Sequence, residues 1–236
     1  MTSLTRSRRI ELLDRVDEEV TPEDLAGNLR DIRRANRFFG GTRSVLSALD
    51  EAIVDVGHST APITLLDLAT GSADIPAAIA RRASRRGWSV QITATDWQPE
   101  IVEAALAAQQ SRSIRVESAD ARDLPYLDDS FDVVLLSLAL HHFEPADAAD
   151  VLREMRRVAK RALIVSDLER SRAGLAGAWL FSRALTRNRL TRHDAPLSVR
   201  RAYTPDEALA LARTAGWTEP RTRRVMPFRY VLTGRP

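Results

Sequence analysis

From Ile63 onward, short apolar runs alternate with helical stretches, and this alternation constrains the fold more than any other feature of the chain. The apolar runs predict buried strands because they are short and rich in Val, Ile and Leu. Strands that alternate with helices form a parallel sheet covered on both faces, so we expect a doubly wound, Rossmann-like α/β fold. The predicted strands are 63–68, 90–95, 114–116, 131–136 and 162–166, and the predicted helices between them are 75–86, 99–110 and 145–159.

The part of the chain before this alternation is predicted to be helical. Apolar side chains stand at helical spacing over 10–16. A capping threonine and a first-turn proline at 21–22 then predict the start of a helix that ends at the glycines of 40–41. A further helix is expected over 42–55. We therefore predict an N-terminal helical lid over 1–58.

The C-terminal part adds a cap and a closing hairpin to the predicted sheet. Residues 168–203 interrupt the alternation, and the amphipathic stretch 174–190 predicts a helix placed where a substrate cap would lie. Residues 192–201 are expected to form a loop that folds back over the site. Apolar positions over 225–232 predict an antiparallel hairpin that completes a seven-stranded sheet. We assign all of this to one domain over 59–236.

Composition and charge exclude several classes of function. The chain has no cysteine, which excludes disulfides and mechanisms that need a thiolate, such as covalent cytosine-C5 methylation. No apolar run is long enough to span a membrane and no secretory signal begins the chain, so a cytoplasmic location is expected. The isoelectric point of about 9.9 reflects arginine, while the net charge is only +3 and acidic residues are spread throughout. We therefore expect no nucleic-acid partner.

The first predicted strand and the turn after it suggest a ligand site. In a doubly wound sheet, ligands bind at the carboxyl ends of the strands. Asp67 stands at that end and can accept a hydrogen bond from an ammonium group. Ala69 and Gly71 lie in the turn, where a glycine lets the backbone approach a ligand and the next helix offers free N–H groups.

Two further acidic residues follow the second and third predicted strands. Asp96 can accept hydrogen bonds from both ribose hydroxyls of an adenosyl group, and Trp97 can lie against the adenine. Asp120 and Ala121 could contact the adenine amino group. The sequence therefore predicts an adenosyl-binding site shared by three strands.

In this order, the segments resemble those of class I S-adenosylmethionine (SAM) dependent methyltransferases, over roughly residues 35–236. The resemblance implies SAM as the cofactor. The segment around motif IV is similar to that of quinone-biosynthesis methyltransferases, and the N-terminal and cap segments look like those of methyltransferases encoded beside type III polyketide synthases. The matching segments are 65–74 for motif I, 95–97 for the ribose acid, 118–121 for the adenine contact and 131–143 for motif IV.

The motif I segment differs from the methyltransferase family at two positions, and it also lacks the glycine pattern of dinucleotide-binding enzymes. The family usually has glycine where Ala69 and Ala73 stand, whereas Gly71 is retained. A nicotinamide dehydrogenase would need Gly-x-Gly-x-x-Gly, and here Asp74 occupies the third glycine position and would face the phosphates. SAM carries no phosphate, so this mismatch favours SAM.

Three histidines are candidates for a general base toward the acceptor. His141 and His142 follow the fourth predicted strand, beside the expected place of the methyl group. Adjacent residues in a regular element cannot both face one pocket, so one of them is expected to pack and orient the other. A hydrogen-bonded structural pair is the alternative. His193 lies in the cap beside Asp194, which could hold its tautomer; otherwise it belongs to a hinge of the cap.

Two further residues complete the predicted cofactor site. In related enzymes an N-terminal helix closes the cofactor site, and Arg37 could pair there with the methionyl carboxylate. A solvated basic face is the alternative. Ser137 stands after the fourth predicted strand where metal-dependent enzymes carry an acid, and no clustered carboxylates follow, so we expect no metal.

The apolar cap indicates a small aromatic or lipid-like acceptor. Trp179 and Phe181 in the cap, with Phe38 and Phe39 in the lid, carry this interpretation. The first hypothesis is O-methylation of a phenolic or polyketide-like compound, and the second is C-methylation of a quinone precursor. A protein of this fold that catalyses a cyclisation without methyl transfer, or that serves as a binding subunit, remains a third. The sequence leaves a homodimer open.

Overall fold

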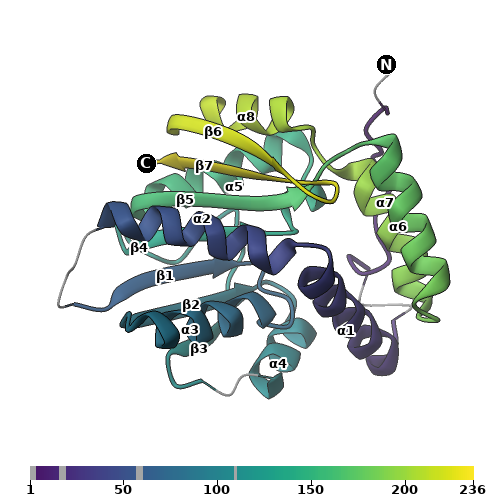
Figure 1. Cartoon of the computed structure of the whole chain (residues 1–236), viewed down its shortest axis with the longest axis horizontal. Coiled ribbons are helices and arrows are strands. Elements are labelled where there is room, and N and C mark those ends of the chain that lie inside the picture. The colour runs from purple at the N-terminus through teal and green to yellow at the C-terminus, as the bar shows by residue number, and fades with distance from the viewer. Residues whose placement is uncertain (1–3, 16–19, 57–60, 109–110) are drawn as a thin grey trace.

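A seven-stranded sheet forms the centre of the computed structural model, which describes residues 4–15, 20–56, 61–108 and 111–236 (Figure 1). Its strand order is β3-β2-β1-β4-β5-β7-β6. The first five strands are parallel, whereas β7 runs antiparallel to both β5 and β6. The predicted doubly wound fold and its closing hairpin are confirmed. The strands are β1 (Ile63–Leu68), β2 (Val90–Asp96), β3 (Ile114–Ser118), β4 (Phe131–Ser137), β5 (Ala159–Leu168), β6 (Thr218–Val225) and β7 (Arg229–Arg235).

Helices cover both faces of the sheet because successive side chains of each strand point to opposite sides. In β1, Leu65 packs with side chains of α2 (Gly41–Val56) and α3 (Asp74–Arg86). Its neighbours Leu66 and Leu68 pack on the other face with side chains of α5 (Pro145–Val158) and α8 (Pro205–Thr214). β1 is therefore buried on both sides, which fixes the position of its carboxyl end.

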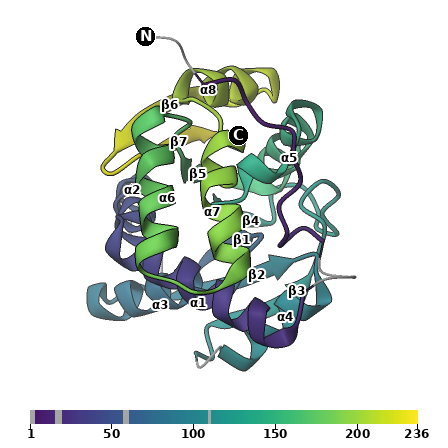
Figure 2. The same cartoon turned by 90° about the vertical axis from the view of Figure 1, so that its right-hand side faces the viewer.

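Three helices gather beyond the carboxyl ends of the parallel strands, where Figures 1 and 2 both show α6 and α7 side by side. They are α1 (Pro22–Phe38), α6 (Arg172–Ala184) and α7 (Arg189–Arg201), while α4 (Pro99–Ala108) follows β2. The helix expected over 174–190 therefore ends early, and the residues expected as a loop form α7. Asn188 explains the difference, because its side chain accepts the Thr191 N–H and starts the second helix.

The N-terminal segment, residues 4–15, is not the helix that its apolar spacing predicts. It follows an irregular path past α5 and α7, drawn in purple in Figure 2. The N–H groups of Leu12 and Leu13 donate to the carboxylate of Asp194, at 2.8 and 3.0 Å. Arg6 donates to the carbonyl of Phe143 at 2.7 Å. The two hydrogen bonds to Asp194 occupy backbone N–H groups that a helix over this segment would use.

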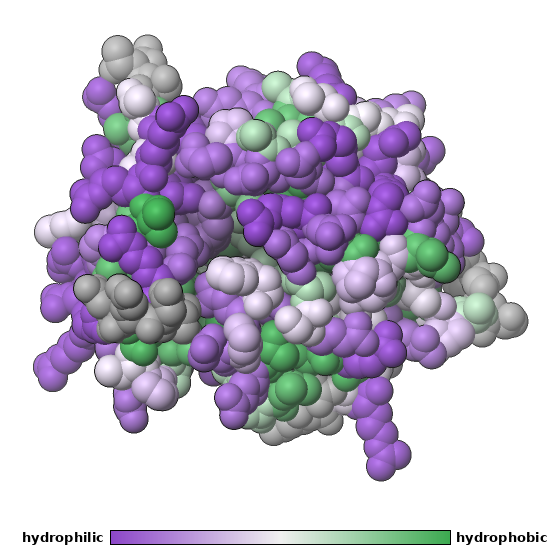
Figure 3. All heavy atoms as spheres, turned by 180° about the vertical axis from the view of Figure 1, so that it is seen from behind, coloured by the Kyte–Doolittle hydropathy of each residue, from purple (hydrophilic) through white to green (hydrophobic). Residues whose placement is uncertain are grey.

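The outer surface seen from behind is mostly hydrophilic, with hydrophobic side chains in small, separated groups (Figure 3). Among the helices of the described residues, none combines the length and apolar character that crossing a bilayer requires.

Candidate functional site

A cavity of about 950 Å³ lies at the carboxyl ends of β1, β2 and β4. The loops after these strands form one wall, and α1, α6, α7 and the N-terminal segment form the other. Of the described residues that line it, ten are Asp or Glu and four are Arg. The cavity therefore favours a ligand that carries positive charge.

Asp67 stands near the end of β1 and its side chain is buried in the cavity wall. One carboxylate oxygen, Oδ2, accepts the Thr70 hydroxyl at 2.6 Å. The other, Oδ1, has no hydrogen-bond partner among the residues that the structure describes. Burial raises the pKa of Asp67 to about 7, and the negative charges of Asp74 and Asp96 raise it further. The hydrogen bond from Thr70 has the opposite effect and lowers the pKa. An N–H donor that carries positive charge would satisfy this group.

The turn after β1 has left-handed backbone at Ala69, Gly71 and Ala73, with φ of 49°, 57° and 53°. A Cβ added to Gly71 would have no heavy atom within 4 Å, so the backbone borders open space there. The N–H of Gly71 donates to Asp96 Oδ2 at 3.1 Å. This hydrogen bond joins the turn after β1 to the end of β2. The left-handed backbone at Ala69 and Ala73 explains why the family favours glycine at these two positions, since residues with a Cβ are strained in this conformation.

Four more of the predicted cofactor residues, Trp97, Asp120, Ala121 and Ser137, line the same cavity. Trp97 is 59% exposed and lines it directly after β2. Asp120 forms an ion pair with Arg122 at 2.7 Å, and the hydrogen bond from that guanidinium holds the pKa of Asp120 below its usual value. The hydroxyl of Ser137 is buried without a hydrogen-bond partner within the described ranges. The structure thus brings together Asp67, Ala69, Gly71, Asp96, Trp97, Asp120, Ala121 and Ser137.

The two adjacent histidines lie on a 3₁₀ turn, η1 (Leu140–His142), directly after β4. His141 Nδ1 lies 2.7 Å from Asp167 Oδ1, and His142 Nδ1 lies 2.8 Å from Asp14 Oδ1. The centroids of the two imidazole rings are 4.4 Å apart, and both residues line the cavity. The expectation that they could not both face one pocket is therefore wrong. The turn is too short to behave as a regular element, and a separate carboxylate anchors each ring.

His142 carries a positive charge at neutral pH. Burial lowers its pKa, but the carboxylates of Glu11, Asp14 and Asp167 outweigh burial and raise the pKa to about 9. In the ligand-free protein this imidazole is therefore largely protonated on both nitrogens. It can act as a general base only after it has lost one of these protons.

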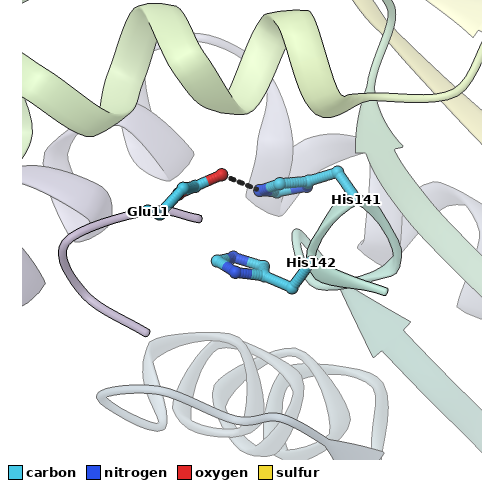
Figure 4. Close-up of side chains that lie close together, drawn as sticks. All are labelled: Glu11, His141 and His142. Atoms are coloured by element: carbon cyan, nitrogen blue, oxygen red, sulfur yellow. Dashed lines mark ion pairs between the residues drawn. The ribbon is translucent and has the colours of Figure 1, made fainter. Parts of the chain in front are cut away.

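The side chain of Glu11 reaches the histidine pair from the N-terminal segment (Figure 4). Its Oε1 lies 3.8 Å from His141 Nε2 and 3.8 Å from Arg201 Nε. Glu11, Asp14 and Asp167 were not among the site residues predicted from the sequence. The rule that ligands meet the carboxyl ends of strands could have found Asp167 in β5. No comparable signal marks the other two, because their segment has no regular structure.

Two predicted site residues lie outside this cavity. His193 is 2.7 Å from Asp194 and lines a separate hollow beside Trp179 and Arg200. Arg37 is exposed, with its guanidinium 5.7 Å from the Phe38 ring. The structure therefore brings neither side chain to this cavity, and the solvated face is the better interpretation of Arg37.

The predicted aromatic cap is only partly directed toward the cavity. Phe39 and Phe181 line it and pack edge to face, with ring centroids 5.3 Å apart. Phe38 and Trp179 are instead 72% and 54% exposed. Phe38 is adjacent to Phe39, and Trp179 is two positions before Phe181. In each of these two pairs, one side chain faces the cavity and the other faces solvent.

Comparison with known proteins agrees with this arrangement. A family model described as "Methyltransferase domain" matches residues 65–162. Demethylmenaquinone methyltransferase of Thermotoga maritima is 29% identical over 68% of this chain and 61% of its own length. The enzyme of the same name from Deinococcus radiodurans is 35% identical over 52% of this chain and 49% of its own. The chain thus spans about half to three-fifths of these curated relatives.

Solved structures share the fold. Human N-acetylserotonin methyltransferase in complex with SAM superimposes with a TM-score of 0.67 at 17% identity, covering 91% of this chain and 56% of that one. The cyclase SpnF gives a TM-score of 0.58 at 18% identity, covering 82% and 80%. With the family match, these likenesses confirm the resemblance predicted from the motifs: residues 65–162 form a methyltransferase domain, within a chain that has the class I methyltransferase fold.

Proposed function

We propose that the chain binds SAM in the 950 Å³ cavity and transfers its methyl group to a small molecule. The observation that carries the proposal is the pair of buried carboxylates, Asp67 and Asp96, on either side of the open backbone at Gly71. Asp67 Oδ1 would accept from the methionyl ammonium, and Asp96 would accept from the ribose hydroxyls. The volume lies in the upper part of the range for small-molecule sites, which leaves room for an acceptor beside the cofactor.

The side chains of this chain fit SAM in charge and in shape. SAM supplies an electrophilic methyl group on a sulfonium, and its two cationic centres suit the excess of carboxylates around the cavity. Trp97 would stack on the adenine, with Asp120 and Ala121 at its edge. The loop after β4 at Ser137 would border the methyl group. These residues act by binding and orienting, which supplies most of what an in-line methyl transfer needs.

The acceptor half of the cavity favours a ring that carries a hydroxyl group. Phe39 and Phe181 provide an aromatic wall, and the histidine pair lies on the polar side. A phenol that has lost its proton is nucleophilic at oxygen and at the ring carbons beside it. O-methylation of a phenolic or polyketide-like compound remains our first hypothesis. C-methylation of a quinol precursor is second, and the demethylmenaquinone relatives favour it.

Calorimetric titration with SAM tests the cofactor, and the absence of binding at millimolar SAM would refute it. Transfer of a labelled methyl group to a panel of phenols and quinols then tests the acceptor. Products whose label is removed by ether cleavage are O-methylated, and products that retain it are C-methylated. A product without label, formed while SAM is not consumed, would instead indicate a cyclisation.

A further inference from the structure

Three side chains with metal-ligating atoms converge at one point of the cavity wall. Glu11, His141 and His142 each offer one such atom, and these atoms all lie within 4.8 Å of one another (Figure 4). Ligands at about 2.0 to 2.2 Å from a zinc ion stand roughly 3 to 3.5 Å apart. Small rotations of the side chains would close the present separation to that value. The cluster joins the N-terminal segment to the loop after β4.

Both imidazoles are already held as metal-bound imidazoles usually are. His141 Nδ1 faces Asp167 and His142 Nδ1 faces Asp14, at 2.7 and 2.8 Å. A carboxylate at Nδ1 fixes the proton there and leaves the Nε2 lone pair for a metal. His141 Nε2 lies 3.8 Å from Glu11 Oε1, and one ring nitrogen of His142 lies within 4.8 Å of the ligand atoms of both residues. General-base catalysis would need only one of the two histidines, so the duplication favours a shared ligand.

Glu11 supplies a buried carboxylate oxygen that accepts no hydrogen bond within the described part of the chain. The residue is 2% exposed, and its Oε2 accepts the Ser198 hydroxyl at 2.8 Å. Its Oε1 has no hydrogen-bond partner among the described residues, although a buried carboxylate oxygen normally has one. The Arg201 guanidinium lies 3.8 Å away but donates to the carbonyls of Arg9, His141 and His142.

The charges around the cluster match a divalent cation. Glu11, Asp14 and Asp167 contribute three negative charges and Arg201 one positive charge, so the formal sum with neutral imidazoles is −2. A dication bound there would neutralise the site and satisfy the open oxygen of Glu11. Two nitrogens and one carboxylate suit a transition metal better than Mg²⁺ or Ca²⁺, which prefer oxygen ligands.

We propose that Glu11, His141 and His142 form a binding site for a divalent transition-metal ion such as Zn²⁺. Three protein ligands leave at least one coordination position open, as in catalytic zinc sites, and all three residues line the cavity. An acceptor hydroxyl bound at that position would lose its proton more readily. This role in catalysis rests on the proposed function, whereas metal binding does not.

Zinc binding to chelator-treated full-length protein tests the proposal by calorimetry, with Co²⁺ absorption as a spectroscopic check of nitrogen ligation. We expect one ion per chain and a rise in the thermal unfolding midpoint. Glu11→Gln retains the acceptor for Ser198 but loses the charge, and should weaken Zn²⁺ binding by about 100-fold or more. Asp14→Asn should weaken it by about 10- to 100-fold, because it acts through His142.

The matched control is His193→Ala, which removes a carboxylate-paired histidine outside the cavity and should leave zinc affinity unchanged. Circular dichroism establishes that each variant is folded. Absence of stoichiometric Zn²⁺ binding, or equal affinity in wild type, Glu11→Gln and His142→Ala, would overturn the proposal. SAM affinity is measured in parallel on wild type: zinc binding without SAM binding would refute the proposed function alone, and the reverse result would refute the metal site alone.

Discussion

Asp67 is expected to destabilise the ligand-free protein, and replacing it with asparagine should show this. The side chain is buried, one carboxylate oxygen lacks a partner among the described residues, and the charges of Asp74 and Asp96 lie nearby. Burial and these charges raise its pKa to about 7, although the hydrogen bond from Thr70 acts against them. Asp67→Asn removes the charge and keeps an oxygen that can accept from Thr70.

The size and sign of the effect follow from the two pKa values of Asp67. In the unfolded chain the pKa is 3.8 and in the folded chain about 7, so the carboxyl group is neutral in both states below about pH 4. Between pH 4 and 7 only the unfolded state ionises, so stability falls as pH rises. Above pH 7 the full penalty applies, about 3 pKa units or about 4 kcal/mol. Asp67→Asn should therefore stabilise the protein by about 2 to 4 kcal/mol at pH 8.5 and by about 1 kcal/mol at pH 4.5.

Urea unfolding of the SAM-free protein, followed by far-UV circular dichroism at both pH values, measures this difference. The control is Asp150→Asn on α5, where the carboxylate is 44% exposed and a change below about 0.5 kcal/mol is expected at either pH. A gain for Asp67→Asn that does not vary with pH, or a loss at pH 8.5, would refute the reasoning. The same variant should bind SAM at least about 10-fold more weakly, because the neutral amide cannot pair with the methionyl ammonium.

Three further predictions test the turn after β1, the adenine contact and the N-terminal segment. Ala73→Gly should raise the free energy of unfolding by about 0.5 to 1 kcal/mol, since φ is 53° there and glycine relieves the strain; a less stable variant would contradict this. Trp97→Ala should weaken SAM binding by about 10-fold with little change in stability, and quenching of tryptophan fluorescence by SAM should disappear with it. Arg201→Ala should cost about 3 kcal/mol or more and speed proteolysis within residues 4–15, because Arg201 donates to three carbonyls; cleavage at the wild-type rate would count against that role.

The sheet and the cofactor half of the cavity were predictable because they depend on local patterns. A short apolar run in the sequence predicts each of the parallel strands, and the carboxyl ends of parallel strands must lie at the same edge of the sheet. Asp67, Asp96 and Asp120 could therefore be placed together from their positions after three strands. The strain at Ala69 and Ala73 was not visible in the residue types alone, because the left-handed backbone follows from the tight turn between β1 and α3.

The N-terminal segment and α7 show where local patterns stop being sufficient. Spacing over 10–16 predicts a helix, yet Asp194 takes the N–H groups of Leu12 and Leu13 from another part of the chain. A helix of this length is only marginally stable without tertiary packing, so competing tertiary contacts determine whether it forms. Similarly, Asn188 splits the predicted cap helix by capping a second one.

The same division separates the two halves of the cavity. The cofactor half is formed by residues fixed to the ends of strands, and the methyltransferase family match over 65–162 covers all of it. The proposed acceptor half has the histidine pair inside the match, but it takes Glu11 and Asp14 from an irregular segment, Phe39 from the end of α1 and Phe181 from the cap. Those segments lie outside the match and are positioned only by long-range hydrogen bonds and packing. Changes of acceptor among proteins that share this sheet are therefore expected to map to residues 4–15, 22–39 and 168–203, whereas loss of the cofactor is expected to map to 65–137.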